Sequence, residues 1–483
     1  MRLQFSLALL VTGMAARSAE VRPPNIVYLL ADQWRAQATG YAGDPNVRTP
    51  NLDRLAKEGL CFRNAVSVCP VCTPYRAALM TGRYPTSTGM FLNDAFLPDA
   101  ELCVAEVLKA AGYATAYIGK WHLDGHGRES FIPAERRQGW EYWKAAECDH
   151  DYNHSHYYTG DSEEKRFWDG YDAFAETKDA QQYLRDHAIE TRGRPFVLVV
   201  AYGEPHFPHG TAPAEYRAMY PAEKIKLPPN VPEAMQTRAR QEAQGYYAHC
   251  TALDKCVGDL LATLTETGLE KSTIVVFTSD HGEMLGSHGC PPTMKQVPWN
   301  ESAHVPFLLR YPAIRAARGR VVNTPITTPD ILPTLLGLAA VAIPKTVEGE
   351  DLSKLIRRGR EAGERAALYM GVAPFGPREF AREYRAIRTS RYTYIRDLDG
   401  PWLLFDDEED PYQMDNLAAK PEGRALQEKL DARLRAALKR IGDDFRPARS
   451  YIEEWGYDVA PYGSVPYGPN AKPQSPKRKP AVK

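Results

Sequence analysis

Between Asn25 and about Leu338, short runs of β-branched residues alternate with segments whose apolar residues recur at helical spacing. This alternation constrains the fold more than any other feature, because it is typical of an α/β fold with a mostly parallel central sheet flanked by helices. The expected strands are Asn25–Leu30, Ala114–Ile118, Phe196–Tyr202 and Thr273–Thr278. The expected helices are Pro50–Glu58, Glu101–Ala111, Asp179–Thr191, Arg238–Thr267 and Pro329–Ala339.

The pattern changes after Pro344. Strand-like runs at Tyr384–Arg396 and Pro401–Phe405 precede an amphipathic helical segment at Pro421–Ile441. This order predicts a smaller α+β C-terminal subdomain.

The length of 483 residues exceeds the usual size of one domain. We therefore expect a main α/β domain over residues 24–345 and the smaller subdomain over residues 346–459. From Ala460 onward Pro, Lys, Gly and Ser dominate without any period. This composition predicts a disordered tail over residues 460–483.

The N-terminus has the features of an export signal. Arg2 supplies the positive end, Phe5–Ala16 is a short apolar stretch, and small residues follow up to Ala19. The stretch is too short to span a bilayer. We expect residues 1–19 to be a signal peptide and the mature protein to be secreted or periplasmic, without a membrane partner.

The overall charge argues against a polyanionic partner. Lysine and arginine total 60 and aspartate and glutamate total 61, which gives a formal net charge of -1. A chain so nearly neutral has no general attraction for nucleic acid, so we do not expect nucleic acid as a partner.

Polar clusters directly follow the four expected strands of the main domain. They are Asp32-Gln33, Lys120-Trp121-His122, Glu204-Pro205-His206 and Asp280-His281. In open α/β sheets the ligand site lies outside the carboxyl ends of the strands. We therefore expect these clusters to converge although they are far apart in the sequence.

Cys72 lies at the start of an expected helix, since Pro74 suits a first helical turn and Gly82 suits the end. The free amide groups and dipole of a helix N-terminus favour a developing anion there. A buried, inert cysteine is the ordinary alternative. Cys69 and Cys72 also form one C-x-x-C pair, so a redox function stays open at this point.

The residues around Cys72 resemble the signature of type I sulfatases, within the alkaline phosphatase superfamily. The resemblance rests on Cys72-x-Pro74-x-Arg76 followed by Leu79-x-Thr81-Gly82-Arg83. It extends to Asp32, Gly119-Lys120-Trp121-His122, Pro205-His206, Ser279-Asp280-His281-Gly282-Glu283 and Lys295, and weakly to Leu404-Phe405-Asp406 and Asp410-Pro411. In that family the cysteine is oxidised to formylglycine.

The resemblance implies a divalent cation held by Asp32, Gln33, Asp280 and His281, with Cys72 as a further ligand after its modification to formylglycine. Hard oxygen ligands suit Ca²⁺, which we expect, or Mg²⁺. Gln33 stands where the family more often has a second aspartate, and His281 contributes nitrogen. Mn²⁺ therefore remains an alternative.

The same resemblance implies roles for five further residues. Arg76 would hold the hydrated aldehyde and the sulfate, and Lys120 and Lys295 would contact sulfate oxygens. His122 would orient or deprotonate the hydrated aldehyde. His206 would donate a proton to the leaving oxygen, assisted by Lys295.

These roles together predict a sulfuric ester hydrolase. Its partners would be a sulfated small molecule or glycan and, during maturation, the machinery that generates formylglycine. The alternatives are a phosphodiester or phosphonate monoester hydrolase of the same superfamily, or a non-catalytic extracellular protein that binds glycans. The aromatic-rich stretch Glu141–Ser162 is either part of a sugar subsite or an ordinary surface loop.

Overall fold

The computed structural model describes residues 23–191, 193–359, 363–377, 379–468 and 472–477. The expected signal peptide, residues 1–19, lies outside these ranges. Within them, none of the helices combines the length with the apolar composition that crossing a bilayer requires.

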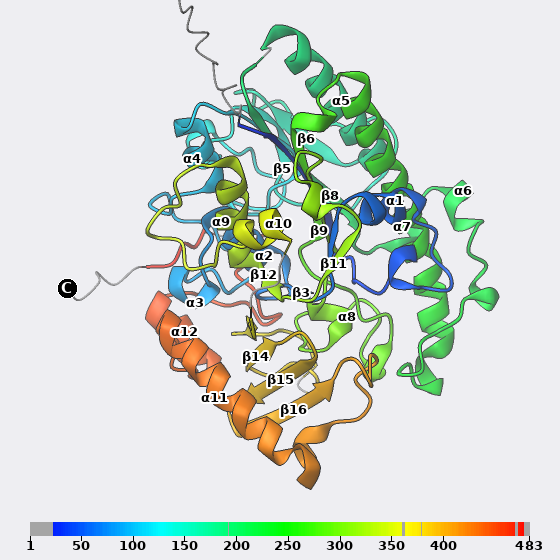
Figure 1. Ribbon diagram of the computed structural model, residues 1–483, viewed down its shortest axis with the longest axis vertical. Coiled ribbons are helices and arrows are strands. Elements are labelled where there is room, and N and C mark those ends of the chain that lie inside the picture. The colour runs from blue at the N-terminus through cyan, green and yellow to red at the C-terminus, as the bar shows by residue number, and fades with distance from the viewer. Residues whose placement is uncertain (1–22, 192, 360–362, 378, 469–471, 478–483) are drawn as a thin grey trace, which may run out of the picture.

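A ten-stranded sheet forms the centre of the molecule (Figure 1). From one edge to the other its strands are β11 (Arg320–Val322), β2 (Leu60–Phe62), β10 (Phe307–Arg310), β9 (Thr273–Ser279), β1 (Asn25–Asp32), β8 (Phe196–Pro205), β4 (Ala114–Lys120), β5 (Tyr142–Ala146), β6 (His156–Thr159) and β7 (Arg166–Phe167). The central run from β9 to β5 is parallel, and antiparallel strands flank it on both sides. The predicted α/β class is confirmed.

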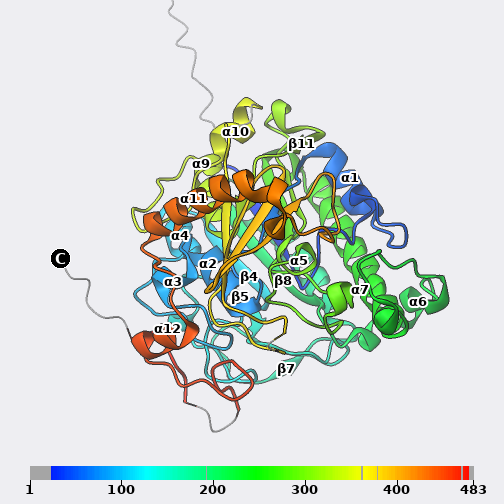
Figure 2. The ribbon, with the colours of Figure 1, turned by 90° about the horizontal axis from the view of Figure 1, so that it is seen from below.

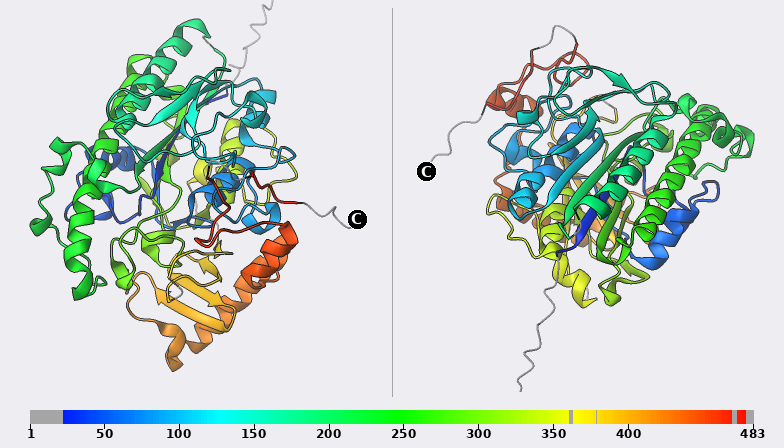
Figure 3. Two further views of the ribbon diagram at one scale, coloured as in Figure 1. Left: turned by 180° about the vertical axis from the view of Figure 1, so that it is seen from behind. Right: turned by 90° about the horizontal axis from the view of Figure 1, so that it is seen from above.

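Helices cover both faces of this sheet. The α-helices of the described residues are α1 (Pro50–Glu58), α2 (Cys72–Thr81), α3 (Pro85–Thr88), α4 (Val104–Ala110), α5 (Asp172–Glu190), α6 (Ala214–Arg217), α7 (Glu233–Glu266), α8 (Asn300–Ala303), α9 (Thr328–Ala339), α10 (Ser353–Arg358), α11 (Arg424–Ile441) and α12 (Ala448–Trp455). The right-hand view of Figure 3 shows α5 and α7 side by side on one face.

The two faces can be followed along β1, whose side chains alternate between them. Ile26 and Leu30 belong to the core that includes α2, α4 and α9, whereas Val27 and Leu29 belong to the core that includes α1, α5 and α7. A strand buried on both faces is apolar throughout, as β1 is until it reaches Asp32. The four expected strands all run one to three residues beyond their predicted ends, so three of the polar clusters begin on the strands themselves and the fourth, Asp280-His281, directly follows β9.

The C-terminal part contains a second, antiparallel sheet, whose strands are β13 (Ala367–Gly371), β14 (Tyr384–Arg388), β15 (Tyr392–Asp397) and β16 (Gly400–Asp406). Helix α11 lies across it (Figure 2). Leu434 of α11 belongs to the same continuous apolar core as Ile26 of β1, so the C-terminal part and the main domain share one core. A short pair of strands, β3 (Ala65–Val66) and β12 (Ile326–Thr327), forms a separate two-stranded sheet beside β13.

The structure differs from the prediction of a disordered tail over residues 460–483. Residues 460–468 and 472–477 lie against the main domain: the Val465 amide donates to the carbonyl of Asn93 at 3.1 Å, and the Phe96 amide donates to the carbonyl of Gln474 at 3.2 Å. Val465 is fully buried. Such a segment has no period to detect, because single side chains and backbone bonds anchor it.

The C-terminal sheet generates a prediction for stability. Arg385 of β14 donates from Nε to Asp443 Oδ2 at 2.5 Å, and both side chains are completely buried. The change Asp443→Ala should lower the free energy of unfolding by about 3–5 kcal/mol, because the Arg385 guanidinium would stay buried without its anion. Denaturant unfolding measures this change. The control Asp444→Ala removes an exposed carboxylate and should leave stability nearly unchanged; equal stabilities of the two variants would contradict the prediction.

Candidate active site

The predicted polar clusters meet at one edge of the sheet. Strands β9, β1, β8 and β4 are neighbours and parallel, so their carboxyl ends lie together. Asp32 ends β1 and Lys120 ends β4, while His206 directly follows β8 and Asp280 directly follows β9. Cys72 is the first residue of α2, as expected, and is buried at this edge. The expected convergence is therefore present.

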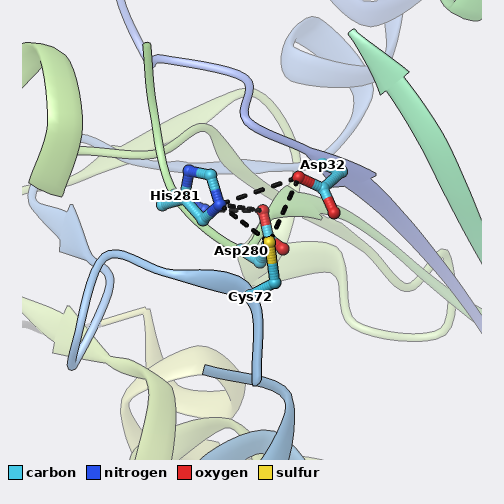
Figure 4. Close-up of side chains that lie close together, drawn as sticks. All are labelled: Asp32, Cys72, Asp280 and His281. Atoms are coloured by element: carbon cyan, nitrogen blue, oxygen red, sulfur yellow. Dashed lines mark hydrogen bonds and ion pairs between the residues drawn. The ribbon is translucent and has the colours of Figure 1, made fainter. Parts of the chain in front are cut away.

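Four side chains form a candidate cation site (Figure 4). The ligand atoms of Asp32, Cys72, Asp280 and His281 all lie within 4.8 Å of one another, and all four residues are buried. His281 Nε2 is 3.4 Å from Cys72 Sγ and 3.6 Å from both Asp32 Oδ1 and Asp280 Oδ1. His281 Nδ1 lies 3.0 Å from the carbonyl of Gly282, so Nδ1 carries the proton and the Nε2 lone pair is free.

The donor set fits a divalent cation. Buried Asp280 Oδ2 accepts no hydrogen bond from any described residue, and its nearest cationic atom is Arg76 Nη2 at 3.5 Å. Burial and the neighbouring Asp32 carboxylate raise the pKa of Asp280 to about 6. Two carboxylates crowded in this way disfavour their joint ionisation unless positive charge lies between them. Carboxylate oxygens with one imidazole nitrogen suit Ca²⁺, Mg²⁺ or Mn²⁺.

Gln33 borders this site with its amide oriented by its neighbours. Its Nε2 donates to Glu283 Oε2 at 2.6 Å, and its Oε1 accepts from Lys295 Nζ at 2.9 Å. Behind Glu283, His209 lies 3.3 Å from the carboxylate and also bonds to Glu242 at 2.9 Å. Burial would lower the pKa of His209, but these two carboxylates raise it to about 9.

Basic groups surround Cys72 Sγ. Lys120 Nζ lies 3.7 Å and Lys295 Nζ 3.6 Å from the sulfur. Burial acts to raise the pKa of the Cys72 thiol, but Lys120, Lys295 and His281 hold it well below its usual value. An anionic atom at this position is therefore stabilised from several sides.

Arg76 does not reach the cavity. Its guanidinium is completely buried and donates to Asp32 Oδ2 at 3.1 Å and to the carbonyl of Lys120 at 2.6 Å. Lys120 Nζ binds the same Asp32 oxygen at 2.6 Å. The structure thus places Arg76 behind the candidate ligands, where it balances the charge of Asp32 and Asp280.

His122 pairs with Asp94, an acid that no sequence motif marks. Its Nε2 lies 3.0 Å from Asp94 Oδ1, and Asp94 also binds Arg128 Nε at 2.9 Å. Burial would lower the pKa of His122, but Cys148 and Asp94 raise it to about 9. Asp94 and Arg128 come from loops without any motif, so only the fold reveals them.

His206 and Lys295 form a hydrogen-bonded pair. Lys295 Nζ lies 2.8 Å from His206 Nε2, and His206 Nδ1 lies 2.7 Å from the carbonyl of Phe207. The pattern assigns the ring proton to Nδ1 and makes Nε2 the acceptor of the Lys295 ammonium. Burial and the charge of Lys295 hold the pKa of His206 well below its usual value, so His206 Nε2 stays an acceptor.

A cavity of about 390 Å³ opens above Cys72. Its lining includes four of the predicted catalytic residues besides Cys72 itself. The lining residues are Cys72, Asn93, Lys120, His122, Arg128, Cys148, His150, His206, Phe207, Lys295, Phe375, Tyr462, Ser464 and Tyr467. Within the stretch Glu141–Ser162, Trp143 lies in the core, while His150 stacks on His206 with ring centres 4.7 Å apart. Part of this stretch therefore lines the cavity and part of it belongs to the core.

The cysteines do not form a redox pair in the structure. All eight are free thiols. Burial raises the pKa of Cys69 to about 12, and Cys69 does not line the cavity.

The chain is similar in sequence to known proteins over most of its length. The sequence profile of the family described as "Sulfatase" matches residues 24–341, and one described as "N-sulphoglucosamine sulphohydrolase, C-terminal" matches residues 288–440. The chain is 54% identical over 438 residues to an "Ulvan-active sulfatase" of Formosa agariphila, covering 91% of this chain and 85% of the relative. It is 30% identical to an "Endo-4-O-sulfatase" of Bacteroides thetaiotaomicron, covering 91% of this chain and 95% of the relative.

Solved structures show the same fold. BT33494S-sulf of Bacteroides thetaiotaomicron superimposes with a TM-score of 0.78 at 30% identity, covering 89% of this chain and 98% of that one. The Sulfatase profile covers more than half of the chain and includes both Cys72 and the candidate cation ligands. The chain therefore belongs to the sulfatase family of the alkaline phosphatase superfamily.

Proposed function

We propose that this sulfatase hydrolyses a sulfate ester on a carbohydrate, with Cys72 modified to formylglycine and a divalent cation, Ca²⁺, beside it. The observation that carries the proposal is the set of charged and polar groups around Cys72 Sγ. Two ammonium groups, one imidazole and two carboxylates lie around this atom at the base of a cavity.

Asp32, Asp280 and His281 would hold the cation, with Gln33 Oε1 and the modified residue 72 as further ligands. When bound, the cation lowers the pKa of a hydroxyl of the hydrated aldehyde and so supplies a nucleophile at neutral pH. Arg76 holds the Asp32 carboxylate in place and offsets its charge. In this proposal Arg76 acts by holding Asp32, and not by the direct contact with sulfate that the resemblance implied.

Lys120 and Lys295 bind the sulfate oxygens. Both lysines line the cavity, and both ammonium groups lie within 3.7 Å of Cys72 Sγ. Fixed charges that meet the growing negative charge stabilise the transition state without reorganising. His122, held by Asp94 and with a pKa of about 9, orients the nucleophile by donating from Nδ1.

His206 and Lys295 deliver the proton to the leaving oxygen. The Lys295 ammonium already donates to His206 Nε2, and both side chains face the cavity. As the alkoxide departs, this proton moves through His206 Nε2 to the alkoxide oxygen, and Lys295 is left as a neutral amine.

A carbohydrate substrate is supported by the relatives, which include enzymes named for activity on ulvan and for endo-4-O-sulfatase activity. The aromatic side chains of the cavity wall also suit a sugar. Export through the expected signal at residues 1–19 would place the enzyme in the periplasm or outside the cell, after modification of Cys72 by the formylglycine-generating machinery.

The modification of Cys72 is directly testable. In protein from a host able to make formylglycine, the peptide containing Cys72 should lose one sulfur and two hydrogens and gain one oxygen by mass spectrometry. Cys148, which lines the same cavity outside the C-x-P-x-R motif, should stay a thiol in the same digest. An active enzyme with an intact thiol at position 72 would refute the proposed nucleophile.

Removal of a cation ligand should reduce occupancy and turnover together. Asp280→Ala should weaken cation affinity by more than about 100-fold, since even residues that only orient ligands are worth about 10- to 100-fold. Elemental analysis of Ca²⁺, Mg²⁺ and Mn²⁺ alongside kinetics measures both effects. Asp259→Ala, on the surface of α7, is the control. Full occupancy and unchanged turnover in Asp280→Ala would exclude Asp280 from the site.

The leaving group should reveal the role of His206. General acid catalysis is worth about 10²–10⁴-fold, and the benefit shrinks as the leaving group becomes less basic. His206→Ala should therefore slow alkyl and sugar sulfates far more than aryl sulfates with acidic phenols. Rates across graded leaving groups measure the dependence, with His154→Ala, an exposed histidine outside the cavity, as the control. An equal loss for every leaving group would assign His206 to substrate positioning instead.

A further inference from the structure

We propose that the C-terminal stretch 460–468 is part of the substrate site and binds the sugar residues that neighbour the sulfated one. This inference rests on the proposed function and adds a substrate class to it: an oligosaccharide chain whose residue next to the sulfated sugar carries a second anionic group. The side chains that would bind it are Tyr467 with Arg128, and Tyr462 with Phe375.

The stretch has a fixed position relative to Cys72. The Val465 amide donates to the carbonyl of Asn93 at 3.1 Å, and the side chain of Asn93 accepts from the amide of Thr73 at 3.1 Å. Thr73 directly follows Cys72 on α2. Asn93 thus ties the C-terminal stretch to the helix that presents the nucleophile.

Tyr467 and Arg128 form one wall of the cavity. The guanidinium carbon lies 3.8 Å from the centre of the Tyr467 ring, and about a quarter of the Arg128 side chain is exposed (27%). Arg128 uses Nε and Nη2 to bind Asp94, at 2.9 and 3.2 Å. Its Nη1 makes no hydrogen bond to any described residue, so a charged donor remains for an anionic acceptor on the substrate.

This free donor suggests why the neighbouring sugar should be anionic. In the proposed function the sulfate ester is bound by Lys120 and Lys295 near Cys72, whereas Arg128 contacts Tyr467 of the C-terminal stretch. A carboxylate or a second sulfate would match the planar donor edge of Arg128. A tyrosine face can pack against the apolar face of a sugar ring.

The binding path continues beyond the first cavity. Tyr462 and Phe375 line the cavity of about 390 Å³ and also a second cavity of about 850 Å³. Tyr462 is half exposed (52%), and its ring centre is 5.6 Å from that of Tyr467. Two cavities that share Tyr462 and Phe375 in their linings have room for several sugar residues of one chain. A small sulfate ester would occupy only the first cavity.

The test compares two kinds of substrate in the full-length enzyme. The first is 4-nitrophenyl sulfate, which reaches only the reaction centre. The second is a panel of sulfated oligosaccharides with a uronic acid or a second sulfate next to the sulfated residue, together with the same uronic-acid oligosaccharides after reduction of their carboxyl groups. The measured quantity is the ratio of kcat/KM for each oligosaccharide to kcat/KM for 4-nitrophenyl sulfate.

Tyr467→Ala should lower this ratio by about tenfold or more, mainly through KM, and Tyr462→Ala should act in the same direction. Arg128→Gln should lower it only for oligosaccharides with an anionic neighbour, and reduction of the carboxyl should abolish that difference for the uronic acid. The ratio also corrects for any effect of Arg128 on His122 through Asp94. Tyr412→Ala, an exposed tyrosine outside both cavities, should leave the ratio unchanged.

Two failures can be told apart. A wild-type enzyme with formylglycine and cation that cleaves neither kind of substrate would refute the proposed function. An enzyme that cleaves 4-nitrophenyl sulfate but no oligosaccharide, or whose ratio is the same in Tyr467→Ala and wild type, would overturn the C-terminal subsite while leaving the proposed function standing. A lower ratio in Tyr467→Ala with no effect of Arg128→Gln would retain the aromatic contact and refute the anionic neighbour.

Discussion

The buried carboxylate of Asp32 is the charge on which the reaction centre depends. It is completely inaccessible to solvent, so burial alone would raise its pKa, yet Lys120, His206 and Arg76 hold the pKa well below its usual value. A buried carboxylate is stable only when opposite charges lie in good geometry around it. The positive charges come from Lys120 at the end of β4 and Arg76 of α2, so the charge balance of Asp32 depends on the order in which the sheet and helix bring these elements together.

The sequence predicts the parts of this arrangement that have local signals. Alternating strands and helices predict the sheet, and polar residues placed at strand ends predict that Asp32, Lys120, His206 and Asp280 converge. Asp94 and Arg128 have no such signal, because their importance arises only from contacts between loops that are distant in the chain. The predicted strands end too early along the chain, because a polar residue at the carboxyl end of a strand resembles the start of a loop.

Neighbouring side chains also decide which of its possible contacts a residue makes. Arg76 is suited to binding sulfate by its chemistry, but the structure uses its donors on Asp32 and on the carbonyl of Lys120. Gln33 offers an oxygen toward Lys295 because its nitrogen is held by Glu283. An amide can lie in either of two orientations, and here a carboxylate behind it selects one.

The C-terminal stretch joins the cavity wall without contributing to either sheet. Substitutions there can alter the wall while the strands, the candidate cation ligands and the buried charges around Asp32 stay as they are. Glycan preference could therefore diverge among descendants of this enzyme with little cost to the chemistry, because the two properties lie on separate parts of the chain. It also means that an affinity tag fused directly after this stretch would begin beside the cavity that contains Cys72.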